Sequence, residues 1–286
     1  MNFQAAKCPE CGGDLQVPND RDFVKCMYCG RDIKVREAIL DAAAGKVENW
    51  LLLAKAAAEA SNHEEAYKYF TQVLEVDPKN HKAWFGKAEA AGWNSNLNND
   101  RFAELLTGIQ HGIEVAPEDL QGTLSELGAA IVANVSASYF QLSLDHFEKY
   151  VALDDSWEEH VDRSQLVLAA LVGANKLDPK DKSAIELAIE VSKRLLEGVS
   201  YDDPYDTTDS GSPRRKSYHL PESMEPDIRK LFDGFSQQLR AIDPTYQTPE
   251  IKKAGEIGCG GIALVVVIVL LGAAAALWLL RTVFAK

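Results

Sequence analysis

The chain has 286 residues, 46% of them hydrophobic, and a formal net charge of −13, so it is long enough for a sizeable core. Residues 37–250 carry 20 basic and 37 acidic side chains, a net charge of −17. Because affinity for nucleic acid is supplied largely by clustered Lys and Arg, this composition makes nucleic acid an unlikely partner for that part.

The N-terminus contains two Cys-x-x-Cys knuckles. Cys8 and Cys11 form the first, and Cys26 and Cys29 form the second, with fourteen residues between them. This spacing lets two thiolates of one tight turn reach the same ion, and two knuckles complete a tetrahedral site. We expect a short β-hairpin between the knuckles and a third strand near Ile33.

Residues 6–36 resemble the zinc-ribbon family, with rubredoxin-like knuckles. The resemblance implies one structural Zn²⁺ per chain, with Cys8, Cys11, Cys26 and Cys29 as ligands. A four-thiolate iron site and a pair of disulfides are the alternatives. A closed all-cysteine site has no open position for a catalytic water, so the predicted metal is structural. It would supply the folding free energy that about 30 residues cannot obtain from their own core.

Zinc ribbons can bind nucleic acid or protein, and this ribbon carries enough cations for a small basic face. These cations are Arg21, Lys25, Arg31, Lys34 and Arg36. The ribbon is nearly neutral overall, with six basic and five acidic residues in 1–36, which favours protein docking or a purely structural role.

From Ala38 to about residue 199 the chain has a helical period. Residues 47–80 resemble the tetratricopeptide repeat (TPR), in which small residues let two antiparallel helices approach and aromatic residues fill the space between units. The matching positions are Trp50, Leu53, Ala54, Ala57, Ala66, Phe70 and Pro78. A degenerate second unit runs from Trp84 to Pro117. Four more helices are expected at about 118–134, 137–153, 157–176 and 181–197. The fold class predicted for 38–199 is therefore mainly α, an α-solenoid of TPR-like helical hairpins behind a small β zinc ribbon over 1–36.

The TPR resemblance implies an inner groove lined by the first helix of each pair. In the first two pairs, these helices offer Lys55, Glu59, Lys82, Phe85, Glu89 and Trp93. We predict that Lys55, Lys82, Phe85 and Trp93 bind a protein partner, because aromatic and cationic side chains dominate binding hot spots. The alternative is that Phe85 and Trp93 belong to the core.

Two elements are expected between the solenoid and the C-terminus. Residues 200–221 are rich in Pro, Gly, Ser and Asp, which predicts a flexible polar linker. Residues 222–243 then have an apolar stripe at helical spacing, which predicts an amphipathic helix that caps the solenoid. Folding back into the groove and pairing with a partner are the alternatives for this helix.

The C-terminal region predicts a membrane anchor. Residues 262–280 are apolar without interruption and would span about 28 Å as a helix, close to the hydrocarbon core of a bilayer. We expect a transmembrane helix over 258–280, preceded by a juxtamembrane segment over 244–257; a buried soluble helix is the alternative. The arrangement resembles tail-anchored proteins.

Because metal-binding thiols favour a reducing compartment, the N-terminal body is expected in the cytoplasm of a single-pass protein.

Motifs of catalysis are absent from the sequence. It contains no phosphate-binding loop, no nucleophile elbow and no His-Glu zinc motif, and its six histidines are scattered. We therefore expect no enzyme but a membrane-anchored adaptor or scaffold that binds protein partners through its TPR-like groove. The alternative is a membrane-bound regulator whose zinc ribbon binds nucleic acid.

Overall fold

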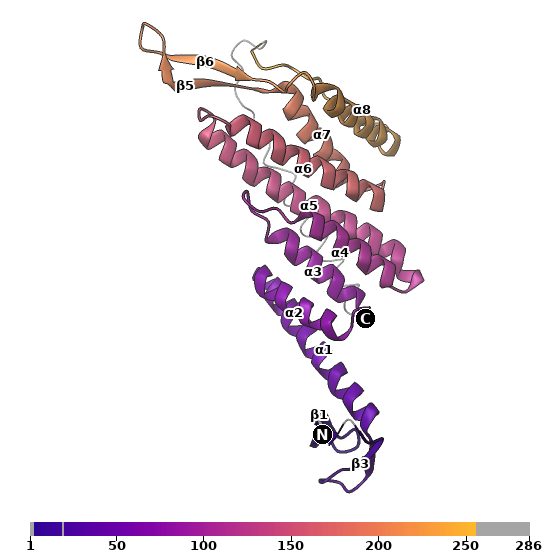
Figure 1. Cartoon of the computed structure of the whole chain (residues 1–286). Coiled ribbons are helices and arrows are strands. Elements are labelled where there is room, and N and C mark those ends of the chain that lie inside the picture. Colours follow the sequence, from indigo (N-terminus) through magenta and orange to yellow (C-terminus); the bar gives the residue numbers. More distant parts are fainter. Residues whose placement is uncertain (1–2, 19, 256–286) are drawn as a thin grey trace.

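The computed structural model describes residues 3–18 and 20–255 (Figure 1). A small β module lies at one end, a stack of antiparallel helices forms the body, and a β-hairpin lies at the other end. The fold is therefore mainly α with stacked helical hairpins, as the sequence predicts. The predicted transmembrane helix lies outside the described residues.

The β module consists of two separate hairpins, and each knuckle is the turn of its own hairpin. Strand β1 pairs antiparallel with β2, and β3 pairs antiparallel with β4. The strands are β1 (Phe3–Lys7), β2 (Asp14–Pro18), β3 (Phe23–Lys25) and β4 (Asp32–Lys34). The prediction of a hairpin between the knuckles is therefore wrong, because the tight Cys-x-x-Cys turns reverse the chain themselves and bring each strand back onto its neighbour.

Four helices follow the β module directly. They are α1 (Val35–Glu59), α2 (His63–Val76), α3 (His81–Trp93) and α4 (Phe102–Val115). Asn62 and Asn80 cap α2 and α3 with their side-chain oxygens, each accepting a hydrogen bond from a backbone N–H in the first turn. Small residues let the helices approach closely: a Cβ added at Gly108 of α4 would lie only 2.7 Å from the Cβ of Ala88 in α3.

The second half of the stack is built from α5 (Glu118–Tyr150), α6 (Ser156–Leu177) and α7 (Lys182–Glu197). The two helices predicted at 118–134 and 137–153 are a single helix of 33 residues. No Gly or Pro interrupts the chain at 134–137, and Val135 and Ser136 are buried there, so packing favours a continuous helix. Among the described helices, α5 has the length and composition of a membrane span, but 61% of its most apolar window is buried inside the protein, as in a core helix.

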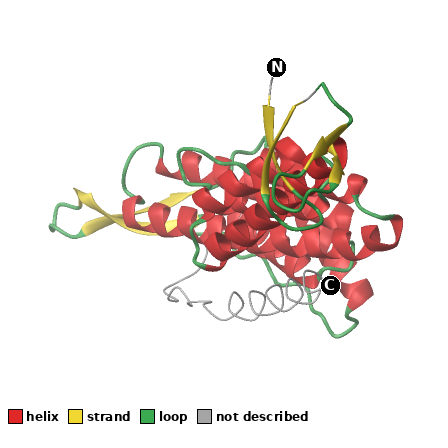
Figure 2. Ribbon diagram, turned by 90° about the horizontal axis from the view of Figure 1, so that it is seen from below, coloured by secondary structure: helices red, strands yellow, loops and turns green. Residues whose placement is uncertain are grey.

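The predicted flexible linker at 200–221 is an ordered β-hairpin. Strands β5 (Val199–Thr207) and β6 (Pro213–Tyr218) pair antiparallel and project beyond the helices (Figure 2). Aromatic stacking holds its root: the ring of Tyr218 stacks on Trp157 at 5.9 Å and on Tyr201 at 5.2 Å. The composition of this segment is polar, and only docking on Trp157 of α6 supplies the apolar surface that a two-stranded ribbon needs.

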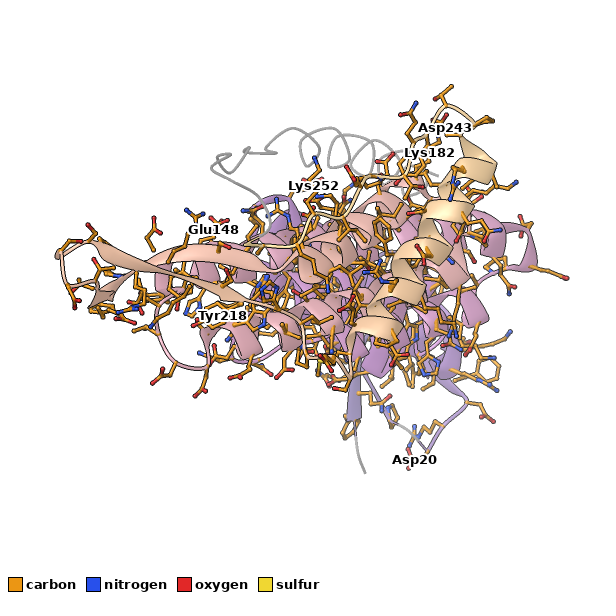
Figure 3. All side chains as sticks on the ribbon, turned by 90° about the horizontal axis from the view of Figure 1, so that it is seen from above. Asp20, Glu148, Lys182, Tyr218, Asp243 and Lys252 are labelled. Carbon is orange, nitrogen blue, oxygen red and sulfur yellow. The ribbon has the colours of Figure 1, made fainter. Side chains whose placement is uncertain are left out.

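Helix α8 (Glu225–Ile242) packs on α7 and adds its apolar stripe to the main core. Lys182 at the start of α7 forms a 3.0 Å ion pair with Asp243 at the end of α8 (Figure 3). The following segment returns along the body, where the backbone N–H of Ala254 donates to Glu197 O at 2.7 Å. The described chain thus ends beside the root of the hairpin.

Candidate metal centre and helical groove

The four cysteines of the knuckles form one cluster. Their Sγ atoms all lie within 4.8 Å of one another, with 3.8 Å between Cys8 and Cys29 and 3.7 Å between Cys11 and Cys26. A tetrahedral ion with metal–sulfur bonds of about 2.3 Å requires sulfur–sulfur distances of about 3.8 Å. The donor set therefore fits one tetrahedral metal ion.

Both knuckles have the same backbone construction. In the first, Cys8 N–H donates to Gly13 O at 2.9 Å, and Gly12 N–H donates to Cys8 O at 2.8 Å. The second repeats this turn, with Gly30 N–H donating to Cys26 O at 2.9 Å. Gly12 and Gly30 have φ angles of 72° and 76°, a region that favours glycine. The local sequence of each knuckle thus determines its shape, whereas packing of the two hairpins brings the knuckles together.

The thiols of the cluster differ in proton affinity. Backbone N–H groups of Cys29 and Tyr28 lower the pKa of Cys26 to about 6. For Cys11, the hydrogen bond from Gly13 lowers the pKa, but burial and the neighbouring thiols raise it to about 12. A bound cation takes all four ligands as thiolates, so metal binding at this cluster releases protons.

The residues predicted to form the partner-binding groove are not brought together. Phe85 is 2% exposed and belongs to the main core, so its prediction as a contact residue is wrong. Trp93 is half-buried and stacks on His63 with ring centroids 5.8 Å apart. Lys55 is exposed on α1, and Lys82 is half-buried on α3. None of these four predicted residues lines the groove found between α3 and α4.

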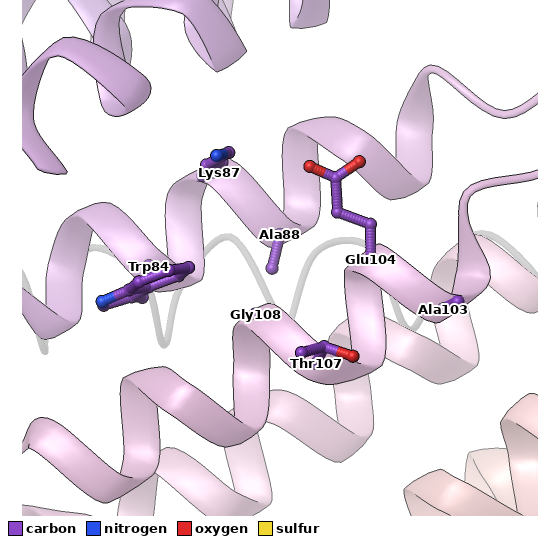
Figure 4. A pocket seen from close by; sticks show the side chains of 7 residues that line it. All are labelled: Trp84, Lys87, Ala88, Ala103, Glu104, Thr107 and Gly108. Atoms are coloured by element: carbon purple, nitrogen blue, oxygen red, sulfur yellow. The ribbon is translucent and has the colours of Figure 1, made fainter. Parts of the chain in front are cut away.

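That groove has a volume of about 300 Å³ (Figure 4). It is lined by Trp84, Lys87, Ala88, Ala103, Glu104, Thr107 and Gly108. The indole N–H of Trp84 donates to Pro78 O at 2.9 Å, which fixes the ring at the wall of the groove. At about 100° per residue, Trp84 lies about 200° around α3 from Lys82. The groove is therefore on the side of α3 opposite to the predicted one.

A hydrogen-bonded network fixes Glu104 at the edge of this groove. Tyr67 donates its hydroxyl to Glu104 Oε1 at 2.6 Å, and Arg101 donates to Oε2 from Nε at 2.9 Å and from Nη2 at 2.5 Å. Burial raises the pKa of Glu104, but these hydrogen bonds outweigh it and hold the pKa below its usual value. The carboxylate is therefore ionised and already neutralised by Arg101.

Lys87 lies between two aromatic rings of the groove. Its Nζ is 5.0 Å from the ring centroid of Tyr67 and 6.0 Å from that of Trp84. Arg101 lies over the same Tyr67 ring at 4.3 Å. Among the residues that the structure describes, no carboxylate oxygen pairs with Lys87 within 4.0 Å. The groove therefore carries one cation without a direct counter-ion.

Sequence reasoning missed Trp84 and Lys87 as site residues. The available signal was their spacing of three residues, which places both on one face of a helix, together with the small pair Ala88 and Gly108. The repeat pattern predicts an inner face but does not indicate how far neighbouring helices cover each side of α3.

Residues 47–90 match the family model described as tetratricopeptide repeat. The match covers α2, most of α3 and the second half of α1, so it includes Trp84 and Lys87 but not α4. No curated protein gives a significant match to the chain.

Proposed function

We propose that this protein is a membrane-tethered, non-catalytic adaptor that binds a protein partner through its helical repeats. The main observation behind the proposal is the groove between α3 and α4, which lies inside a TPR-like stack and contains an aromatic wall and a cation without a direct ion pair. Trp and cationic side chains at the centre of a concave surface are typical of binding hot spots.

The metal of the N-terminal module is proposed to be zinc in a structural role. Four thiolate ligands at tetrahedral spacing favour Zn²⁺ and leave no position for a catalytic water. Elemental analysis of the purified full-length chain is expected to find one zinc per chain. Stoichiometric iron, or four cysteines in disulfides, would contradict the assignment.

The membrane tether is proposed from the apolar sequence of 262–280, with the N-terminal body in the cytoplasm. Residues 244–255, which precede this apolar sequence, are docked on the helical body. This docking supports a fixed orientation of the body relative to the membrane. Tyr246 and Ile251 pack against the main core, and Lys253 forms a 3.0 Å ion pair with Glu225 of α8. In sealed vesicles, protease is expected to remove an N-terminal tag without detergent, and a protected tag would refute this topology.

Partner binding is tested by proximity labelling with the full-length anchored protein. Ala103 is exposed at the edge of the groove, so Ala103→Trp should fill the groove without disturbing the core, and Ala103→Ser serves as the matched control. The labelled set is expected to lose members with Ala103→Trp only. If the same proteins are labelled with Ala103→Trp, the binding surface lies outside the groove.

The alternative of nucleic-acid binding by the ribbon has less support. One of its cations, Arg31, forms an ion pair with Glu10, which reduces the positive charge available for phosphate. Binding that weakens steeply with salt would favour this alternative.

A further inference from the structure

The charges around the α3–α4 groove are not balanced. Two cations, Arg101 and Lys87, act on one carboxylate: Arg101 and the Tyr67 hydroxyl donate directly to the oxygens of Glu104, and Lys87 acts on it only at longer range. Lys87 remains, held over the rings of Tyr67 and Trp84. A ligand that enters the groove therefore gains most from a negative group near Lys87 Nζ.

The shape of the groove limits the size of that group. Its floor is formed by Ala88 and Gly108, where α3 and α4 approach closely, and one wall is the fixed ring of Trp84. Thr107 adds an exposed hydroxyl on the α4 side. A volume of about 300 Å³ is at the lower end for a ligand pocket and suits one side chain with a short aliphatic stem.

We infer that this groove binds a glutamate side chain of a protein partner, with Lys87 as its counter-ion and Trp84, Ala88 and Gly108 as the surface for its methylene groups. The inference rests on the proposed adaptor function and specifies the chemistry of the partner. Ala103 and Thr107 are exposed at the edge of the groove, so a partner segment can pass over it and insert an internal side chain. Thr107 is placed at the edge of the groove to donate a second hydrogen bond to the carboxylate.

The negative net charge of the body does not oppose this contact. Repulsion from distant carboxylates is screened over about 8 Å at physiological salt, whereas an ion pair with Lys87 is made at hydrogen-bond distance. The partner segment should carry one isolated acidic residue between apolar residues, because the groove offers one cation without a direct ion pair and a second carboxylate would meet Glu104.

The test uses peptides of about twelve residues selected from a random displayed library against the full-length chain in detergent micelles. Peptides that bind the wild type but not Ala103→Trp are groove binders. Thr107→Phe is a second blocking variant in case Ala103→Trp alters the fold, which circular dichroism checks. Lys87→Gln removes the proposed counter-ion. Lys68→Gln removes the same charge from the exposed face of α2 and is the matched control.

Groove binders are expected to share a Glu flanked by apolar residues. Replacing that Glu by Gln should weaken binding to the wild type about tenfold, but less than about twofold in Lys87→Gln, because the contact is already lost. A pair of peptides with a free and an amidated C-terminus should bind equally. Tighter binding of the free acid would show that the groove takes a chain end and would overturn the side-chain assignment.

Groove binders without a shared acidic residue, or an equal loss in Lys68→Gln and Lys87→Gln, would also overturn the inference. If peptides bind the full-length chain but none is sensitive to the blocking variants, the inference fails while the adaptor function stands. If no peptide binds the full-length chain, the result counts against both.

Discussion

The four-cysteine ribbon and the helical stack differ in how much apolar surface they bury. The ribbon, with the first turn of α1, has eight buried core residues, two of which are the candidate metal ligands Cys8 and Cys26. The main cluster of the stack has thirty-five buried residues, drawn from α3 to α8. Four large apolar side chains of the ribbon, by contrast, are more than half exposed: Phe3, Phe23, Met27 and Tyr28. Burial of apolar surface can stabilise the stack by itself, whereas the ribbon is proposed to require a bound metal ion.

The two modules share one helix, which makes the difference testable in one molecule. Helix α1 starts immediately after β4, and its second half packs against α2. Chemical removal of the metal should therefore destabilise the N-terminal end of α1. Core mutations in the stack should instead destabilise its C-terminal half.

The largest effect is expected from metal removal. A chelator under reducing conditions should unfold 3–34 completely, because a segment of this size has too little core without the metal. Hydrogen exchange should become fast in β1–β4 while the amides of α5 and α6 stay protected. Cys8→Ser should reproduce the loss, and Met27→Ala, an exposed position in the other knuckle, should not. Simultaneous loss of protection in α5 would show that the modules are not independent.

The second effect is expected from a cavity in the stack. Leu171 of α6 is 0% exposed, so Leu171→Ala should lower the free energy of unfolding of the helical body by about 3–5 kcal/mol. Leu52→Ala, at an exposed position of α1, should change it by less than about 0.5 kcal/mol. Denaturant titration measures both variants, and each should still bind one metal ion. A loss of metal from Leu171→Ala would contradict the separation.

A third effect should depend on pH and belong to the stack alone. His160 is buried beside Phe147, with ring centroids 4.9 Å apart, and its Nδ1 is 3.1 Å from Ser143 Oγ. Burial, with Arg163 and Arg194 nearby, lowers its pKa to about 4 from the ordinary value of 6.5. The unfolded chain therefore binds a proton between these values that the folded chain does not.

Stability of the helical body should consequently fall as the pH decreases from about 6.5 to about 4, by about 2–3 kcal/mol from this residue. Denaturant titrations at the two ends of this range, compared between wild type and His160→Gln, isolate the contribution. The exposed His111→Gln is the control. Identical pH dependence in His160→Gln and wild type would exclude His160 as the cause.

The smallest effect is expected in the projecting hairpin, where two cross-strand ion pairs differ in burial. Arg215 and Asp202 are 4.0 Å apart and both are more than half exposed. Arg215→Ala should leave the thermal midpoint and hairpin exchange rates unchanged. Asp203, which is 5% exposed and bonded to Lys216 at 2.7 Å, should matter more, so Asp203→Asn should speed amide exchange in β5 and β6. Equal behaviour of the two variants would contradict this ranking.

Features that depend on local spacing can be predicted from the sequence alone. The two Cys-x-x-Cys turns, each followed by a glycine, predict a four-cysteine metal cluster without any knowledge of the fold. The period of the apolar residues predicts α6 and α7, and the small and aromatic positions of 47–80 predict the first helical pair. These patterns succeed because the knuckle geometry and the amphipathic face of a helix are set within one or two turns of chain.

Contacts between distant segments determine the C-terminal hairpin, the continuous α5 and the position of the groove. The hairpin at 199–218 depends on Trp157, more than forty residues before Tyr201, and its own polar composition favours a linker. The continuous α5 depends on burial of Val135 and Ser136 rather than on propensity. The groove of Trp84 and Lys87 forms where α4 packs beside α3, while α2 and α5 cover other parts of α3. A repeat pattern identifies which residues can face a groove, but only the packed neighbours determine which face remains accessible.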